Sequence, residues 1–221
     1  MMAWLAALPW FEIAEATLDT LLMLGASMGL TLLLGLPLGA LLFLTGNRQL
    51  LAAPRFYSTA SFVVNVLRSV PFIILLIVMM PTTEFITGTS LGVPGAIPPL
   101  VVSAVPFFAR LVEIALKEVD RGIIEATQAM GATTRQIVLG ALLPEALPGI
   151  LAALTVTAIA LVSYTAMSGA IGAGGLGDLA IRYGYHRYQH NVMVVTVLLL
   201  LLLVQGLQMA GDWLVLRFTR R

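Results

Sequence analysis

The sequence contains no cysteine, only two histidines and few charged side chains. Without cysteine the chain forms no disulfide and offers neither a thiolate metal site nor a cysteine nucleophile. Charged residues make up 10% of the 221 residues and hydrophobic residues 59%, with a mean hydropathy of +0.99. The formal net charge of +1 provides no basic field for nucleic acid. We therefore expect an all-α polytopic membrane protein that is surrounded by lipid and has no nucleic-acid partner.

Two short patterns that suggest chemistry are incomplete. The run GAGGLG at Gly172–Gly177 lacks the Lys-Ser/Thr of a phosphate-binding P-loop, and no strand pattern precedes it. His186 and His190 stand four apart, a metal-ligand spacing on a helix, but no carboxylate or thiol lies close by in sequence to complete a set. We predict no catalytic residue, no metal site and no cofactor, and we expect a tight turn at the glycine run.

Five apolar stretches are long enough to cross about 30 Å of hydrocarbon. They cover residues 21–44, about 57–80, about 100–116, 147–167 and 192–211. Pro71 is expected to loosen the second span, and residues 81–99 are interpreted as a loop rich in Gly, Pro and Thr. The first span carries two glycine pairs, Gly25 with Gly29 and Gly35 with Gly39. Such pairs favour close helix packing, although glycine is common in membrane helices generally.

Basic residues predict the orientation of the spans. Residues 1–19 hold no Lys or Arg, lack the positive region of a secretory signal, and are interpreted as an outside or interfacial segment with Trp4 and Trp10 among the headgroups. With five spans, the loops on the opposite side carry nine basic residues: Arg48, Arg55, Arg110, Lys117, Arg121, Arg135, Arg217, Arg220 and Arg221. The outer loops carry only Arg182 and Arg187. The N-terminus is therefore predicted outside and the C-terminus in the cytoplasm.

Residues 120–144 form a polar, small-residue segment on the predicted cytoplasmic side. Asp120 suits the N-cap of a first short helix, and Gly131 suits the left-handed turn past its end. Thr133 with Gln136 is a capping box for a second helix. Pro144 and Pro148 are then expected to stop or kink the chain. The segment is predicted to be a compact helical hairpin outside the bilayer, where a partner can contact it.

The order of residues in this hairpin resembles the EAA motif of ABC importer permeases. The matching residues are Glu125, Ala126, Gly131, Leu143 and Pro144. Thr127 stands where a second Ala is usual, and Ala141 where Ile is usual. The resemblance implies that residues 120–144 are a coupling helix that sits in a cleft of an ATP-hydrolysing subunit. Without the resemblance, an ordinary connecting loop would be an equally good interpretation.

The resemblance extends over nearly the whole chain. The stretches RSVPFIILL from Arg68, the hairpin through PEALPGI, and SYTAMSGAIGAGGLGDLAIRYGY follow one another as in the methionine ABC importer permease family. It implies the type I importer fold in one permease domain, residues 1–221, of a bacterial cytoplasmic (inner) membrane. It also implies a homodimer, two cytoplasmic ATPase subunits, an extracytoplasmic methionine-binding (lipo)protein, and transport of L- and D-methionine by alternating access.

Four residues are candidates for the translocation pathway: Arg68, Tyr164, Met167 and Ser168. Arg68 is the one charge well inside a predicted span, and it suits either a cavity wall or a side chain that reaches the cytoplasmic interface. The other three end the fourth span just before the glycine run. We predict Met167 at a pore constriction, because a flexible thioether is an adaptable stopper. Ordinary packing of Met167 against the last span is the alternative.

Other classes of protein fit the sequence less well. A membrane-embedded enzyme would need clustered carboxylates or histidines, which the predicted spans lack. An ATP-independent channel is an alternative that capture of an ATPase subunit would distinguish. Within the importer class, a permease for another small amino acid remains the alternative, because the outside binding protein selects the substrate.

Overall fold

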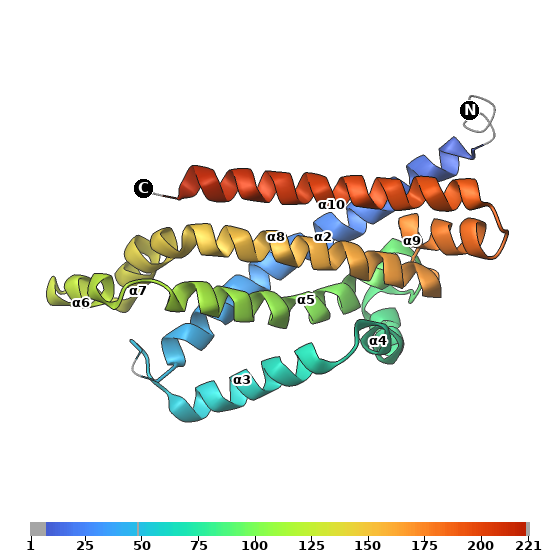
Figure 1. Cartoon of the computed structure of the whole chain (residues 1–221). Coiled ribbons are helices and arrows are strands. Elements are labelled where there is room, and N and C mark those ends of the chain that lie inside the picture. The colour runs from blue at the N-terminus through green and yellow to red at the C-terminus, as the bar shows by residue number, and fades with distance from the viewer. Residues whose placement is uncertain (1–7, 48, 220–221) are drawn as a thin grey trace. The chain divides into compact units, whose positions relative to one another are not determined.

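The computed structural model describes residues 8–47 and 49–219, and helices account for nearly all of them (Figure 1). No strand occurs within those ranges. The long helices are α2 (Trp10–Thr45), α3 (Pro54–Ser69), α4 (Phe72–Thr87), α5 (Gly92–Lys117), α8 (Leu143–Ser168) and α10 (His190–Phe218). The short elements are α6 (Arg121–Ala129), α7 (Thr134–Ile137), α9 (Gly175–Leu179), the 3₁₀ turn η2 (Gly169–Ile171) and the π-helical segments η1 (Val138–Leu142) and η3 (Ala180–Tyr185).

The span count agrees with the prediction when one broken span is included. Four helical stretches of the described chain are long and apolar enough to cross a membrane: Trp10–Thr45, Gly92–Lys117, Thr134–Ile171 and His190–Phe218. A fifth span results if the bent pair of α3 and α4 is counted as one. The predicted all-α, multi-span fold is therefore confirmed.

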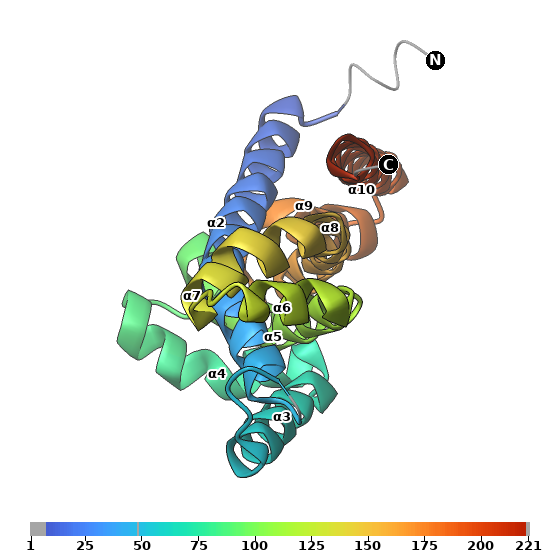
Figure 2. The same ribbon diagram turned by 90° about the vertical axis from the view of Figure 1, so that its left-hand side faces the viewer.

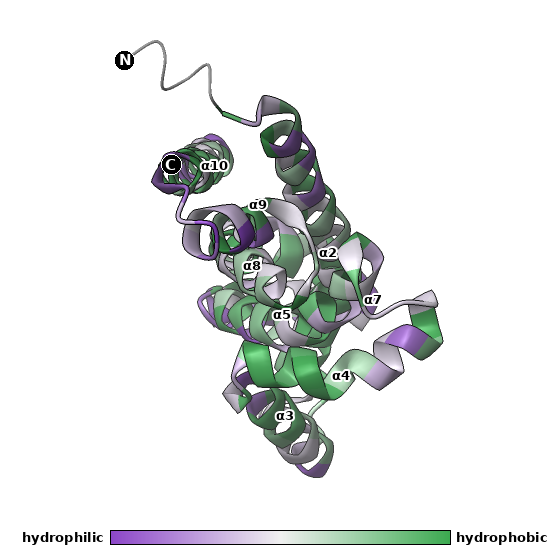
Figure 3. Ribbon diagram, turned by 90° about the vertical axis from the view of Figure 1, so that its right-hand side faces the viewer, coloured by the Kyte–Doolittle hydropathy of each residue, from purple (hydrophilic) through white to green (hydrophobic). Residues whose placement is uncertain are grey.

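Three boundaries differ from the prediction. The helix of the first span begins at Trp10 rather than at residue 21, so the acidic residues before the predicted span lie in the first turns of α2. The second span stops at Ser69 and restarts at Phe72, because Pro71 lacks the N–H that a continuous helix needs. Residues 81–99 are mostly helix rather than loop, since α4 continues to Thr87 and α5 starts at Gly92. Figure 3 shows that α4 begins with a strongly hydrophobic section, which is followed by a polar one.

The chain packs as two compact units. Unit 1 consists of Met1–Leu30, Val70–Ser103 and Ala158–Gln208, and unit 2 of Thr31–Ser69, Ala104–Thr157 and Met209–Arg221. In unit 1, a small core joins the start of α2 to α9 and the start of α10. In unit 2, a larger core joins parts of α2, α5 and α8 to α6, α7 and η1. One permease domain over residues 1–221 stays a prediction.

The glycine pairs of α2 behave differently. A Cβ added at Gly39 would lie 2.6 Å from the carbonyl oxygen of Ala109, and one at Gly35 2.8 Å from the Phe108 ring. This second pair therefore lets α5 approach α2 closely within unit 2, as expected. Around Gly25 and Gly29, apart from the neighbouring backbone of α2 itself, no atom of the described chain lies within 4 Å of an added Cβ.

Trp4, Arg48, Arg220 and Arg221, which entered the orientation argument, lie outside the described residues.

Candidate functional site

The hairpin at residues 120–144 is formed by α6 and α7, which lie side by side (Figures 1 and 2). The Asp120 side chain accepts a hydrogen bond of 2.6 Å from Gly122 N, which caps α6 at its N-terminus. Thr133 accepts from Gln136 N while the Gln136 side chain accepts from Thr133 N, so the predicted capping box is present. Ile124 and Ile137 are buried in the core of unit 2 and hold both short helices on the rest of that unit.

Gly131 makes the turn between the two short helices. Its φ is +79°, in the left-handed region that side chains disfavour. Gly131 N donates 2.9 Å to the carbonyl oxygen of Gln128, and Ala132 N donates to that of Thr127. These bonds satisfy carbonyl groups at the end of α6, as a glycine-terminated helix requires. The predicted conformation of Gly131 is confirmed.

The exit from the hairpin differs from the prediction. The chain does not stop or kink away at Pro144; the π-helical segment η1 leads directly into α8, which contains both Pro144 and Pro148. Pro144 has no N–H to donate to a carbonyl of the preceding turn, and the π turn of η1 lies directly before it. Leu142, at the end of η1, is buried in the core of unit 2. Single π turns inside helices recur at functional sites.

The surface of the hairpin is open to a partner. Glu125 and Ala126 are exposed, and so is Met130 at 78% of its surface. Glu125 borders a pocket of about 160 Å³ with Gln49, Leu50, Arg121, Ile124 and Gln128. A polar rim around exposed apolar side chains is typical of a protein-binding surface. Contact of Glu125 with a partner stays a prediction.

The three candidates at the end of α8 have different environments. The Tyr164 ring stacks on Phe72 with centroids 4.6 Å apart, just after the break at Pro71. Ser168 is fully buried, and its hydroxyl donates 2.9 Å to the carbonyl oxygen of Tyr164. Met167 is 40% exposed. Met167 is therefore the exposed one of these three candidates, whereas Ser168 supports the helix from inside.

The glycine run at Gly172–Gly177 packs against α2 within unit 1. Thr20 Oγ1 on α2 accepts 2.9 Å from Leu176 N at the start of α9. A Cβ at Gly175 would lie 2.8 Å from both Thr20 Oγ1 and the end of Met23. The tight turn predicted here is present, with positive φ at Gly172, Gly174 and Gly175.

A pocket of about 300 Å³ lies beside this turn in unit 1. Its lining residues include Glu12, Glu15, Asp19, Asp178, Arg182 and Tyr183. Arg182 pairs with Asp178 at 2.8 Å, and a hydrogen bond to the Glu12 carboxylate raises the pKa of the Tyr183 phenol. Four carboxylates against one guanidinium leave the pocket negative. Among the described residues, no group of three or more His, Cys, Asp or Glu side chains is placed to hold a metal ion.

Arg68 and the two histidines lie at the ends of helices or between them. Arg68 is exposed in the last turn of α3, its guanidinium 5.8 Å from the centre of the Phe107 ring. A cation at a helix C-terminus is favourable, so Arg68 needs no buried partner. His186 follows η3 and His190 begins α10, with left-handed Tyr188 (φ 55°) between them. The two imidazoles therefore do not share one helical face.

The sequence matches, over residues 35–221, the family described as binding-protein-dependent transport system inner membrane component. The chain belongs to this family. It is 48% identical over 217 residues to the probable D-methionine transport system permease protein MetI of Vibrio cholerae, covering 96% of each chain. It is 45% identical to the methionine import system permease protein MetP of Bacillus subtilis, covering 91% of this chain and 90% of the relative.

Solved structures of the family have the same fold. A chain of the MetNI methionine ABC transporter in an inward-facing conformation superposes with a TM-score of 0.94 at 49% identity, over 96% of this chain and 98% of that one. A more distant chain, from an amino acid ABC transporter with histidines, superposes with a TM-score of 0.76 at 17% identity over 93% of each chain. The expected importer permease family and fold are confirmed, and family members are transport components of the inner membrane.

Two features of these sites were missed by sequence reasoning. The stacking of Phe72 on Tyr164 joins residues that are 92 positions apart (164 − 72), and only packing brings them together. The π turn of η1 leaves no local signal, because Val138–Leu142 reads as ordinary helix. The capping residues around Gly131, by contrast, act over a few positions and were visible in the sequence.

The exposure of Met167 gives a direct test of the predicted constriction. If two copies of the chain meet here, Met167→Cys should cross-link efficiently between copies in the absence of nucleotide and less when ATP is bound. The natural chain has no cysteine, so no background reaction competes. Ser168→Cys is the matched control, because Ser168 is buried and should not cross-link. Absence of cross-linking at residue 167 in every state, with normal uptake by Met167→Ala, would contradict the constriction.

Proposed function

We propose that this chain is the membrane-spanning permease subunit of an ATP-driven importer for methionine, L- and D-, in the bacterial inner membrane. The observation that carries the proposal is the 48% identity to a methionine-transport permease along 96% of both chains. The capped hairpin with its left-handed Gly131 adds a physical device by which a partner can move the helices. Two copies of the chain form the pathway, and a methionine-binding (lipo)protein delivers the substrate from outside.

Energy for transport comes from partner subunits. Two cytoplasmic ATPase subunits bind the hairpins through Glu125, Ala126 and the surface around Gly131. Their closure on ATP moves the hairpins, and the helices that share the core of unit 2 move with them. The pathway then opens alternately to the two sides. Leu143 and Pro144 begin α8, so the movement of the hairpin is transmitted to that helix at its first turn.

Co-purification tests the assignment. The chain, expressed with the ATPase and the binding protein of its own cell, should be recovered as one complex whose binding protein retains methionine. Retention of a different amino acid would replace methionine by that substrate. Failure to recover any ATPase with the chain, under conditions that keep it folded, would favour an ATP-independent channel.

We propose that the N-terminus lies outside and the C-terminus in the cytoplasm, because nine basic residues fall on one side of the predicted spans and two on the other. Thr134→Cys, at the start of α7, should react only with reagents that enter the cytoplasm. His186→Cys, exposed in the predicted outer segment, should react with an impermeant reagent added outside. Labelling of residue 134 from outside would overturn this topology.

A further inference from the structure

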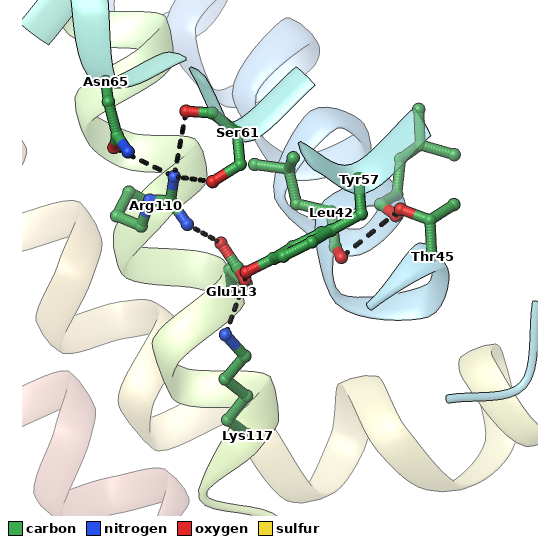
Figure 4. A network of polar contacts seen from close by, with 9 residues as sticks. Leu42, Thr45, Tyr57, Ser61, Asn65, Arg110, Glu113 and Lys117 are labelled. Atoms are coloured by element: carbon green, nitrogen blue, oxygen red, sulfur yellow. Dashed lines mark hydrogen bonds and ion pairs between the residues drawn. The ribbon is translucent and has the colours of Figure 1, made fainter. Parts of the chain in front are cut away.

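A buried carboxylate lies in the last turns of α5, next to the hairpin. Glu113 is fully buried and accepts hydrogen bonds at Oε1 from Lys117 Nζ (2.6 Å) and from the Tyr57 hydroxyl (2.9 Å). Its other oxygen, Oε2, pairs with Arg110 Nη1 at 2.5 Å. Figure 4 shows these groups converging on one carboxylate. Glu113 is therefore the centre of a charged network.

The network joins α5 to α3. Arg110 Nη2 donates to Ser61 Oγ at 2.7 Å and to Asn65 Oδ1 at 3.0 Å. Tyr57, Ser61 and Asn65 are four residues apart along α3, so they form one polar stripe on that helix. Of the residues of α3, only Val64 is buried. Apolar packing alone is therefore a weak attachment for α3, and the hydrogen bonds to α5 fix its position.

Glu113 is the single counter-ion of two cations in this cluster. Removing its charge would leave Arg110, whose side chain is 14% exposed, and Lys117 without a carboxylate. Breaking a buried ion pair by losing one partner is far more damaging than losing an exposed one. The geometry of α3 on α5 thus depends on this one side chain.

The same end of α5 leads into the hairpin. Helix α5 ends at Lys117, and Asp120 already caps α6. Val112, Leu116 and Ile124 belong to one buried core, together with Ile137 and Leu142 of α7 and η1. The shared core therefore attaches the hairpin to the end of α5, and the Glu113 network attaches α3 to the same helix.

We propose that Glu113 is a positioning residue that transmits the movement of the hairpin to α3. The inference rests on the proposed function, since it assumes that ATPase subunits move the hairpin. Glu113 takes no part in binding ATP or substrate. Its carboxylate keeps Arg110 and Tyr57 engaged, so that α3 and α5 rotate together when the pathway changes its opening.

The test follows two labelled positions in the complete complex with its ATPase, in a lipid nanodisc. A single cysteine at Thr134 reports on the hairpin, and one at Ser58, exposed on α3, reports on that helix. An environment-sensitive fluorophore at each should change its emission when ATP binds. In Glu113→Gln, the hairpin signal should remain while the α3 signal is largely lost, and uptake should fall at least about tenfold. Glu118→Gln, exposed and five positions further on, should keep both signals.

A second variant covers the case in which Glu113→Gln does not assemble. Tyr57→Phe with Ser61→Ala and Asn65→Ala removes the side-chain hydrogen bonds from the α3 side and leaves Glu113 paired with both cations. It should show the same separation of signals, with Ser69→Ala as its control, because the Ser69 hydroxyl donates to Asn65 O within α3. A normal α3 response in either variant would overturn the proposal. An unresponsive hairpin label in the unmodified complex would instead contradict the proposed function.

Discussion

Gly177→Ala is expected to prevent stable folding of unit 1. The Cβ of an alanine at this position would lie well inside van der Waals contact with the carbonyl oxygen and Cα of Ala166 in α8. The chain just after α8 approaches α9 equally closely, since a Cβ at Gly169 would overlap the backbone of Gly177 and Asp178. Backbone cannot move aside as a flexible side chain can, so we expect a loss of about 3 kcal/mol or more in the free energy of unfolding. Thermal unfolding in detergent measures this loss.

Gly206→Ala is the matched control for that substitution. Gly206 lies in α10 of the same unit, and the described structure has no atom within 4 Å of a Cβ added there. Alanine is the better helix former by up to about 1 kcal/mol, so the unfolding temperature should stay equal or rise. A Gly177→Ala protein as stable as Gly206→Ala would show that α8 and α9 do not cross at these glycines.

Gly131→Val is expected to abolish coupled transport while leaving the protein in the membrane. The open space around Gly131 means that no clash opposes a side chain. The cost is in the backbone, because a β-branched residue at φ +79° is strained by about 1–2 kcal/mol or more. Relief of that strain would reorient α6 against α7 and displace Glu125. ATP-dependent uptake in reconstituted vesicles should fall to background, while the amount of inserted protein should be unchanged.

Gly131→Asn separates the backbone requirement from the presence of a side chain. Asparagine tolerates the left-handed conformation and replaces glycine at helix ends. It should therefore retain most of the uptake. If valine and asparagine were equally active, the left-handed turn would not be needed for coupling; if both were inactive, the side chain itself would block the partner.

The hairpin was predictable because its signals are local. Asp120, Gly131 and the pair Thr133–Gln136 determine caps and a turn within three residues of themselves. The helix boundaries were less predictable, because prolines were interpreted as breaks. Pro94 stands in the first turn of α5, where its missing N–H costs nothing, and Pro81 lies inside α4. Membrane helices tolerate such prolines when neighbouring groups satisfy the freed carbonyls.

The network around Glu113 was only half visible in the sequence. Arg110 and Glu113 three residues apart indicate a shared helical face, and they do form an ion pair. Their partners on α3 lie 45 to 56 positions away, so only the folded chain brings them together. The same holds for Tyr164, whose stacking partner Phe72 could not be inferred from spacing. The functional roles of the hairpin and of Met167 are predictions that the experiments above test, and the role of Arg68 stays a prediction.

Uptake by proteoliposomes that contain the chain, its ATPase and its binding protein tests the central claim most directly. Labelled methionine, supplied on the side of the binding protein, should accumulate against its gradient with ATP and stop when hydrolysis is blocked. Omission of the binding protein should lower the rate strongly. Equilibration of methionine without ATP, or accumulation of another amino acid in preference to methionine, would contradict the assignment of this chain as a methionine importer permease.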